Sequence, residues 1–230
     1  MPQATHSPAA SWVLRKVFIV LVTLYAVLMM LHWPIGFTFF TQLSNLFAAA
    51  VTLGQLITGG RSRGIELLKY AAAVSITVTF FVFLLVLAPL DPRGIPAAYA
   101  QDHCASLCMH LINPVLTVGD FLADTRSVAP LRKSHIFMAL VPPVGYFAFI
   151  LCLDALGFRW NGMTAPYLFL NYEAPAGWFG FLPETAGFTT LGIGVFYVIL
   201  ILLFLFLLVG RGLYAAAEAI RRRVQAHSAP

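Results

Sequence analysis

The chain has 230 residues, of which 60% are hydrophobic and only 10% are charged. A soluble domain usually carries about 25% charged residues, and a chain of this size could not bury so much apolar side chain, so a soluble globular protein is excluded. The net charge of +5 could suggest nucleic acid as a partner. Here, however, the basic residues stand between hydrophobic runs, where they set membrane topology, and we expect no nucleic-acid partner.

Six segments are apolar over about 20 residues, the length that crosses a bilayer. In chain order they are 13–33, 37–57, 68–88, 104–122, 137–156 and 190–209. The fourth is the least hydrophobic, because it contains His110, Asn113 and Asp120, and a re-entrant segment is its alternative. The sequence predicts an all-α fold, in which residues 1–230 form a single polytopic bundle of six transmembrane helices.

The basic residues predict the orientation of this bundle. If all six segments cross, both termini lie on one side together with 12 of the 14 lysines and arginines, and only Arg93 and Arg159 lie on the other. Because positive residues are retained on the cytoplasmic side, we expect cytoplasmic N- and C-termini. This separation requires the fourth segment to cross fully. We expect the tail from Gly212 to form a short separate helix along the inner surface.

The longest connection, residues 157–189, lies on the predicted outer side. It is rich in Pro, Gly and aromatic residues, including Trp160, Tyr167 and Trp178. Long loops of this kind often cover a site, and aromatic rings also prefer the membrane interface. The loop is therefore either a lid or an interfacial cap without a chemical role.

Two of the predicted spans carry polar side chains on one face. If the helices are regular, these residues fall within arcs of about 100° to 120°. They are Thr38, Thr41, Ser44, Asn45, Thr52 and Gln55 in the second span, and His103, Ser106, His110, Asn113, Thr117 and Asp120 in the fourth.

Depth brings two members of these stripes together. At 1.5 Å per residue, Thr41 lies about 6 Å and His110 about 9 Å below the outer ends of their helices. A hydroxyl and an imidazole at similar depth could form a nucleophile and its base. Such residues also serve as simple interhelical hydrogen-bonding groups in membrane bundles, which is the alternative.

No metal or cofactor is expected. The cysteines Cys104 and Cys108 point away from the face of His110, which argues against a Cys/His metal site. Haem held by two histidines is not expected either, because no second histidine matches the depth of His110. With Cys152, the three cysteines are too few for a disulfide framework, although a Cys104–Cys108 bridge stays open.

Four short patterns resemble one family, the androgen-induced-gene and androgen-dependent TFPI-regulating membrane proteins, with their bacterial branch. The patterns are Phe40-Thr41-Gln-Leu-Ser44-Asn45, then His110 with Pro114 and Asp120, then Pro143-x-x-Tyr146, and finally Gly162-Met163 followed by Pro166-Tyr167-Leu-Phe169-Leu170. Vertebrate members carry an acidic residue three positions after the threonine, where this chain has Ser44, and their His-to-Pro spacing is one residue longer.

The resemblance implies a six-span hydrolase of fatty acid esters of hydroxy fatty acids, with a Thr nucleophile and a His. The matching residues are Thr41 and His110, and the resemblance to the bacterial branch implies the bacterial cytoplasmic (inner) membrane. The expected partner is a membrane lipid or fatty-acyl ester. Further residues expected to bind the oxyanion or substrate are Ser44, Asn45, Asn113, Tyr167, Asn171 and His103.

Two other functions stay open from the sequence. A carrier or channel for a small solute or protons could use the same stripes as its lining, because Thr52, Gln55, Thr117 and Asp120 continue inward. A structural or partner-binding protein has no positive feature apart from the aromatic loop. Nothing in the sequence predicts the oligomeric state.

Overall fold

The computed structural model describes residues 9–60, 62–125, 130–182 and 192–228. The chain is 78% helix, and its described parts contain two isolated β-bridges but no strand. Six helical segments are long and apolar enough to cross a membrane. The all-helical, six-span architecture predicted from the sequence is therefore confirmed.

Each predicted span overlaps one of these segments. The helices are α1 (Ala10–Met29), α2 (Phe40–Thr58), α3 (Arg63–Val82), α4 (Ile95–Leu107), α5 (Asn113–Asp124), α6 (Val141–Ala155) and α7 (Val195–Ser228). Short 3-10 or π segments are η1 (Pro34–Thr38), η2 (Phe83–Leu87), η3 (Ala88–Leu90), η4 (Cys108–Ile112), η5 (Lys133–Leu140) and η6 (Leu168–Leu170). Residues 183–191, which hold the end of the predicted loop and the start of the sixth span, lie outside the described residues.

Two of the predicted boundaries are wrong. The fourth crossing begins at Ile95 rather than at 104, and the helix is interrupted where Asp102, His103 and Cys104 adopt φ values of 51°, 54° and 66°. The assumption of a regular helix therefore fails at His103. The tail from Gly212 is not a separate helix, because α7 continues without a break to Ser228.

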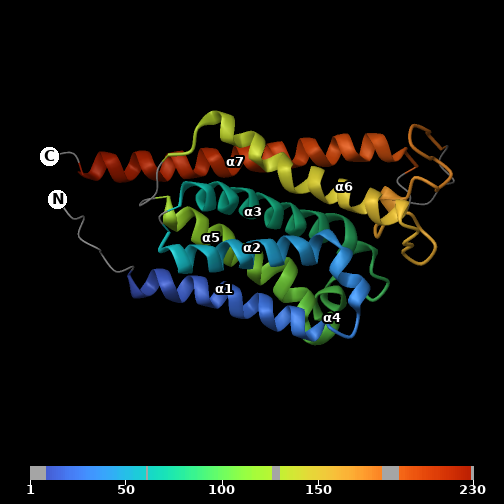
Figure 1. The fold of residues 1–230 in the computed structure, drawn as a ribbon, viewed down its shortest axis with the longest axis horizontal. Coiled ribbons are helices and arrows are strands. Elements are labelled where there is room, and N and C mark those ends of the chain that lie inside the picture. Colours follow the sequence, from blue (N-terminus) through green and yellow to red (C-terminus); the bar gives the residue numbers. More distant parts are fainter. Residues whose placement is uncertain (1–8, 61, 126–129, 183–191, 229–230) are drawn as a thin grey trace.

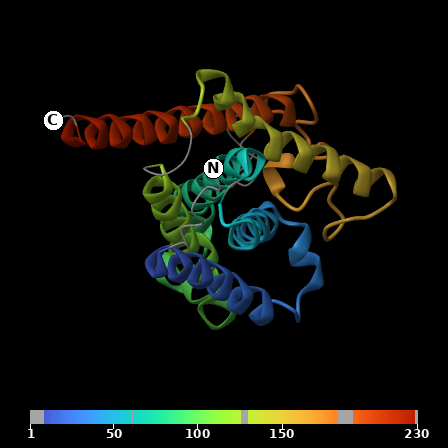
Figure 2. The same ribbon diagram turned by 60° about the vertical axis from the view of Figure 1, so that its left-hand side comes forward.

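The helices run side by side along the long axis of the molecule (Figure 1). Both views place α6 and α7 on one side of α2 and α3, and α1 and α4 on the other (Figures 1 and 2). The start of α1 and the end of α7 lie at one end of the bundle, and the loop between α6 and α7 lies at the opposite end (Figure 1).

The helix α3 is the centre of the bundle. It packs against α2, α5 and α7, and the run from Tyr70 to Val74 is almost completely buried. Three of these residues are alanines, whose small side chains let neighbouring helices approach closely, as is common in membrane bundles. By contrast, α6 and α7 expose large apolar side chains such as Val144 and Phe204, as expected of surfaces that face lipid.

A buried group of charges ties four helices together at the end of the bundle where α1 begins. Lys16 of α1 and Lys69 of α3 each donate to both Asp120 and Asp124 of α5, with N–O distances of 2.5 to 2.9 Å. Gln55 of α2 accepts a further bond from Lys16 at 2.9 Å. We call these five residues the inner ionic cluster. Lys16 and Lys69, counted above only as topology signals, are in fact packed inside the protein.

Candidate functional site

The candidate nucleophile Thr41 stands at the start of a helix. The 3-10 segment η1 ends at Thr38, Phe39 is extended, and α2 begins at Phe40, so Thr41 is the second helical residue. The indole nitrogen of Trp160 donates to the Thr38 hydroxyl at 2.6 Å, which fixes the outer loop to this turn. The loop therefore lies directly beside the first turn of α2.

A π-helical turn presents His110 to this helix start. Pro114 lacks the N–H that would bond to the carbonyl of residue 110 in an α-helix. The chain instead forms η4, in which the amide of Asn113 bonds to the carbonyl of Cys108, five residues back. Such π turns often occur at functional sites, because they reorient one side chain within a helix.

The imidazole of His110 is held on both of its nitrogens. Nδ1 lies 2.9 Å from the Ser106 carbonyl oxygen, and Nε2 lies 3.3 Å from the Thr41 hydroxyl. Nδ1 also lies 3.2 Å from the Ser106 hydroxyl, but the carbonyl oxygen is closer and only accepts hydrogen bonds. We therefore assign the proton to Nδ1, which leaves the lone pair of Nε2 for Thr41. Phe83 stacks on the ring with 3.6 Å between centroids, which fixes its plane.

The predicted proximity of Thr41 and His110 is thus observed, although their catalytic role stays a prediction. Their contact of 3.3 Å is at the long end for a hydrogen bond. Catalytic pairs are often this loose before substrate binds. Both side chains are more than nine-tenths buried.

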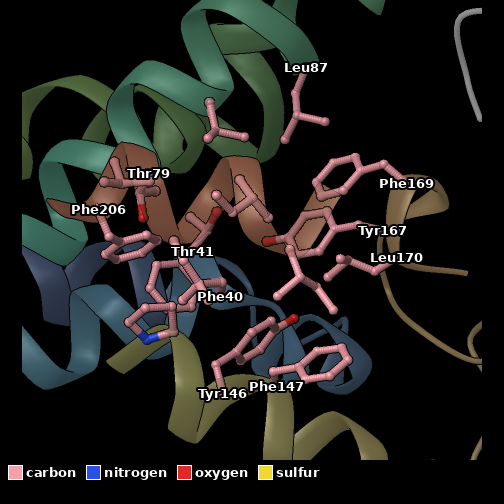
Figure 3. Close-up of a pocket in the computed structure, with 16 residues that line it drawn as sticks. Phe40, Thr41, Thr79, Leu87, Tyr146, Phe147, Tyr167, Phe169, Leu170 and Phe206 are labelled. Carbon is pink, nitrogen blue, oxygen red and sulfur yellow. The ribbon is translucent and has the colours of Figure 1, made fainter. Parts of the chain in front are cut away.

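Tyr167 reaches the same point from the outer loop. Its hydroxyl contacts the side chain of Thr41 and the backbone amides of Phe40 and Thr41, and Figure 3 shows it directed toward Thr41. Burial raises the pKa of Tyr167 to about 12, and these contacts offset part of the rise. The phenol therefore keeps its proton at neutral pH and can donate a hydrogen bond.

Three of the other candidates are already engaged in holding the helices together. Asn45 donates to the carbonyls of Thr41 at 2.8 Å and Met109 at 3.2 Å. Asn113 donates to Asn45 at 2.7 Å and to Thr23 at 2.8 Å. The Ser44 hydroxyl bonds to the carbonyl of Thr41 and to the side chain of Thr79, both at 2.9 Å. These residues support the backbone around Thr41, and their donors point elsewhere than to its hydroxyl.

The last two candidates lie apart from the pair. His103 is exposed within the break in α4, where its backbone carbonyl accepts a bond from the Tyr25 hydroxyl. The side-chain Oδ1 of Asn171 accepts a hydrogen bond from the Thr164 hydroxyl at 2.9 Å. Asn171 therefore orders the outer loop, which carries Tyr167, and does not itself meet Thr41 or His110 in the described structure.

Two cavities meet at Thr41. The first, of about 80 Å³, lies between α2, α3, α6 and α7 and is lined mainly by apolar side chains (Figure 3). The second, of about 320 Å³, lies between the outer end of α1, the start of α2, η2 and η4, and it contains His110. Thr41, Leu87, Tyr167 and Phe169 line both cavities. A ligand with two arms could therefore place its branch point beside the hydroxyl.

Sequence reasoning missed three residues of this site. Ser106 was placed on the polar stripe but not given the role of holding His110. It lies four residues before the histidine, which is a signal that could have found it. Phe83 was placed in the third span, 68–88, and was given no role. Gln42 lines the second cavity, and its amide nitrogen has only the thioether of Met30 at 3.4 Å.

Within the described residues, no group of three or more His, Cys, Asp or Glu side chains could hold a metal ion. The three cysteines are free thiols, so the Cys104–Cys108 bridge left open by the sequence does not form. The polar groups that line the two cavities at Thr41 are hydroxyls, the His110 imidazole, amides, the Trp33 indole and the Asp102 carboxylate. This set suits acid–base and nucleophilic chemistry.

Comparison with known proteins adds no relative. No family model matches the chain, no curated protein matches it, and no solved structure resembles it closely enough to count as a match.

Proposed function

We propose that this protein is a membrane-embedded hydrolase of long-chain lipid esters, with Thr41 as nucleophile and His110 as base. The observation that carries the proposal is the fixed imidazole, whose Nδ1 faces the Ser106 carbonyl and whose Nε2 faces the Thr41 hydroxyl. A hydroxyl is a weak nucleophile until an adjacent base takes its proton. The Ser106 backbone carbonyl has the role that the aspartate carboxylate has in a Ser-His-Asp triad, because it favours the His110 tautomer with the proton on Nδ1.

The reaction proceeds in two halves. In the first, His110 Nε2 accepts the hydroxyl proton while Thr41 Oγ1 bonds to the ester carbonyl carbon, and the carbon–oxygen bond to the alcohol breaks as His110 returns the proton to it. In the second half, His110 Nε2 deprotonates a water molecule that attacks the carbonyl carbon of the acyl-threonine. The bond from this carbon to Thr41 Oγ1 then breaks, and His110 returns the proton to Oγ1. The products are a fatty acid, an alcohol and the free threonine, so one water is consumed per ester.

Tyr167 is placed to bind the oxygen that becomes negative in each half. Its hydroxyl lies at the nucleophile, and a donor already in place there stabilises the oxyanion without reorganisation. Ser44 and Asn45 were proposed for this role from the sequence, but their side chains already form hydrogen bonds to backbone carbonyls of α2 and η4. We therefore assign the oxyanion contact to Tyr167.

The cavities support a lipid substrate. The first cavity has apolar walls (Figure 3), and such walls suit a fatty-acyl chain that enters from the bilayer. Fatty acid esters of hydroxy fatty acids and related long-chain esters are the substrates that we propose. The positive-inside bias supports cytoplasmic termini, which would place the site toward the outer face of a bacterial inner membrane.

The inner ionic cluster argues against the alternative of a channel or carrier. Each lysine ammonium donates three hydrogen bonds within the protein. An ammonium has three donors, so both lysines are saturated. Thr52 donates to its own helix at 2.7 Å. Three of the four polar residues that seemed to extend the stripes inward, namely Thr52, Gln55 and Asp120, are thus engaged within the protein, which argues against an open polar path at that end.

Turnover of a long-chain ester by the purified protein tests the proposal. Thr41→Val removes the hydroxyl with little change of shape, and His110→Phe keeps a ring against Phe83 while removing both nitrogens. We expect each variant to lose about 10³-fold or more in kcat, as for other nucleophile and base removals. Thr52→Val is the matched control, because it is the same substitution on the same helix at a distance from both cavities.

A fluorophosphonate probe gives an independent readout. We expect it to label the wild-type protein and the Thr52→Val control but neither Thr41→Val nor His110→Phe. Labelling or turnover that survives both site substitutions would overturn the proposal.

A further inference from the structure

The side chain of Gln42 is buried next to the proposed nucleophile without a full set of hydrogen bonds. Gln42 directly follows Thr41 in α2 and is only 5% exposed. Among the described residues, its Oε1 has no hydrogen-bond partner and its Nε2 has only the thioether sulfur of Met30, at 3.4 Å. A thioether is a weak acceptor. Because an unsatisfied buried amide is costly, it calls for a partner that arrives during the reaction.

Gln42 lies on the same side of Thr41 as the proposed base. Gln42 and His110 both line the second cavity, and neither is among the described residues that line the first. Met30, which contacts the Gln42 amide, packs in one cluster with Met109, the residue before His110. The amide and the imidazole therefore border one space beside the nucleophile.

Two other polar side chains of this cavity already have partners. Gln101, whose side chain is exposed, donates to Asp91 at 2.8 Å. The carboxylate of Asp102 lies 3.5 Å from His32. Of the two amides in the described walls of this cavity, Gln42 is thus the buried one with hydrogen-bonding capacity to offer.

The proposed reaction places the alcohol arm of the ester in the second cavity. His110 returns the proton to the leaving oxygen, so this oxygen must lie on the side of Thr41 that faces the imidazole. The acyl chain then takes the apolar first cavity. When the alcohol has left, water can reach both His110 and the acyl carbon from the second cavity, whose volume of about 320 Å³ is ample for water molecules.

We infer that Gln42 is the positioning residue for the water that hydrolyses the acyl-threonine. This inference rests on the proposed function and concerns its second half. One O–H of the water donates to His110 Nε2, and the other donates to Gln42 Oε1. The water oxygen bonds to the acyl carbon as its first proton passes to Nε2. The bond from this carbon to Thr41 Oγ1 then breaks, and His110 returns the proton to Oγ1. Gln42 exchanges no proton and only holds the water.

The p-nitrophenyl ester of palmitic acid separates the two halves of the reaction. Nitrophenolate leaves without a proton from His110, so we expect acylation to be fast and release of palmitate to limit the rate. The initial burst of nitrophenolate then measures acylation, and the steady rate that follows measures hydrolysis of the acyl-threonine. The full-length protein is assayed in phosphatidylcholine nanodiscs.

The variant Gln42→Met removes the amide and keeps the length of the side chain. We expect the rate and amplitude of the burst to match the wild type. The steady rate should fall about tenfold or more, because a water that is not held in place loses the advantage of orientation. Gln42→Leu removes the amide with a different shape and should give the same result, so the outcome does not depend on one packing arrangement.

Gln101→Met is the matched control. It is the same substitution in the same cavity, at an amide that is already bound to Asp91. We expect it to leave both the burst and the steady rate as in the wild type.

Hydroxylamine gives a readout that a merely structural role would not change. It is a small, strong nucleophile that attacks the acyl-threonine in place of water and forms palmitoyl hydroxamate. Because it depends less on being held in place, we expect it to raise the steady rate of Gln42→Met by a larger factor than that of the wild type.

The outcomes separate this inference from the proposed function. A wild-type steady rate in both Gln42 variants, or a burst slowed as much as the steady rate, contradicts the role of Gln42 and leaves the hydrolase intact. An equal effect of hydroxylamine on Gln42→Met and the wild type contradicts it as well. Turnover that persists in Thr41→Val, or wild-type turnover without a burst, contradicts the proposed function itself.

Discussion

The position of Thr41 in its helix distinguishes it from five hydroxyls that lie in the interiors of helices. Thr23, Thr52, Ser75, Thr77 and Thr79 all donate to the carbonyl four residues earlier in their own helices. Thr41 is the second residue of α2, so the residue four positions earlier belongs to η1 and not to the helix. Its hydroxyl is left for His110 and Tyr167. The sequence pattern of polar residues does not show which hydroxyl lacks a partner in its own helix, because that depends on the residue at which the helix begins.

At the residue scale, Tyr167→Phe isolates the contribution of one hydroxyl. The ring contacts with Phe39 and Phe169 should persist, so we expect the fold to be retained. Loss of a single oxyanion donor should lower kcat about 10²-fold with a smaller change in KM. Steady-state hydrolysis by the variant measures this effect, and a kcat equal to that of the wild type would show that the tyrosine only covers the site.

At the element scale, two proline-linked π turns face each other. Pro89 follows η2 and Pro114 follows η4, and the two turns carry the stacked rings of Phe83 and His110. Each π turn inserts one extra residue, which rotates the helix beyond it by about 100°. His110, which the sequence placed by regular helical spacing, is thus presented to Thr41 by an irregular helix.

The variant Pro114→Ala tests the turn at His110. Alanine restores the missing N–H, which allows a regular α-helix. The π turn at His110 is then no longer required. We expect His110 to lose its alignment with Thr41, so kcat/KM falls about tenfold to a hundredfold, while the thermal midpoint does not fall. Pro96→Ala is the control, since Pro96 lies at the start of α4, where no helical bond is missing. Wild-type activity in Pro114→Ala would show that the turn is dispensable.

The crossing helices were predictable because their signal is long and redundant. Twenty apolar residues indicate a span whatever their order, and all six were found. The shape of the fourth was not, because nothing in the composition of Gln101 to Cys104 marks three consecutive left-handed residues. The position of Tyr167 could not be predicted either. It lies in a loop, and a loop has no helical period from which the direction or the depth of a side chain can be calculated.

At the scale of the whole molecule, the inner ionic cluster shows the limit of charge counting. Lys16 and Lys69 lie at the end of the bundle that the sequence predicts to be cytoplasmic, and they also neutralise Asp120 and Asp124 inside the bundle. Counting basic residues along the sequence predicts the side of the membrane on which each charge lies. It does not predict the partner of that charge, because the partners lie on helices far apart in the chain. The topology was therefore predicted, but the interaction that fastens α1 and α3 to α5 was not.

The variant Asp120→Asn measures what the cluster contributes. Asp120 is 1% exposed, and removing one member of a buried ion pair leaves its partners uncompensated. The cost is about 3–5 kcal/mol. We expect a clearly lower thermal midpoint in detergent. Glu66→Gln breaks the pair with Arg63, whose side chain is 38% exposed, and should cost less than about 1 kcal/mol. Equal midpoints for the two variants would contradict a stabilising role for the cluster.

The separation of the cluster along the chain also bears on how the protein is made. Lys16 and Asp120 are 104 residues apart, a delay of roughly 5 to 20 s at ordinary rates of synthesis. During that interval the ammonium of α1 has no counter-ion within the bilayer and must stay near the headgroups. The helix that finally receives it follows directly on the turn that holds His110. A nascent chain therefore cannot settle its first span at full depth until the segment bearing the proposed base has entered the membrane.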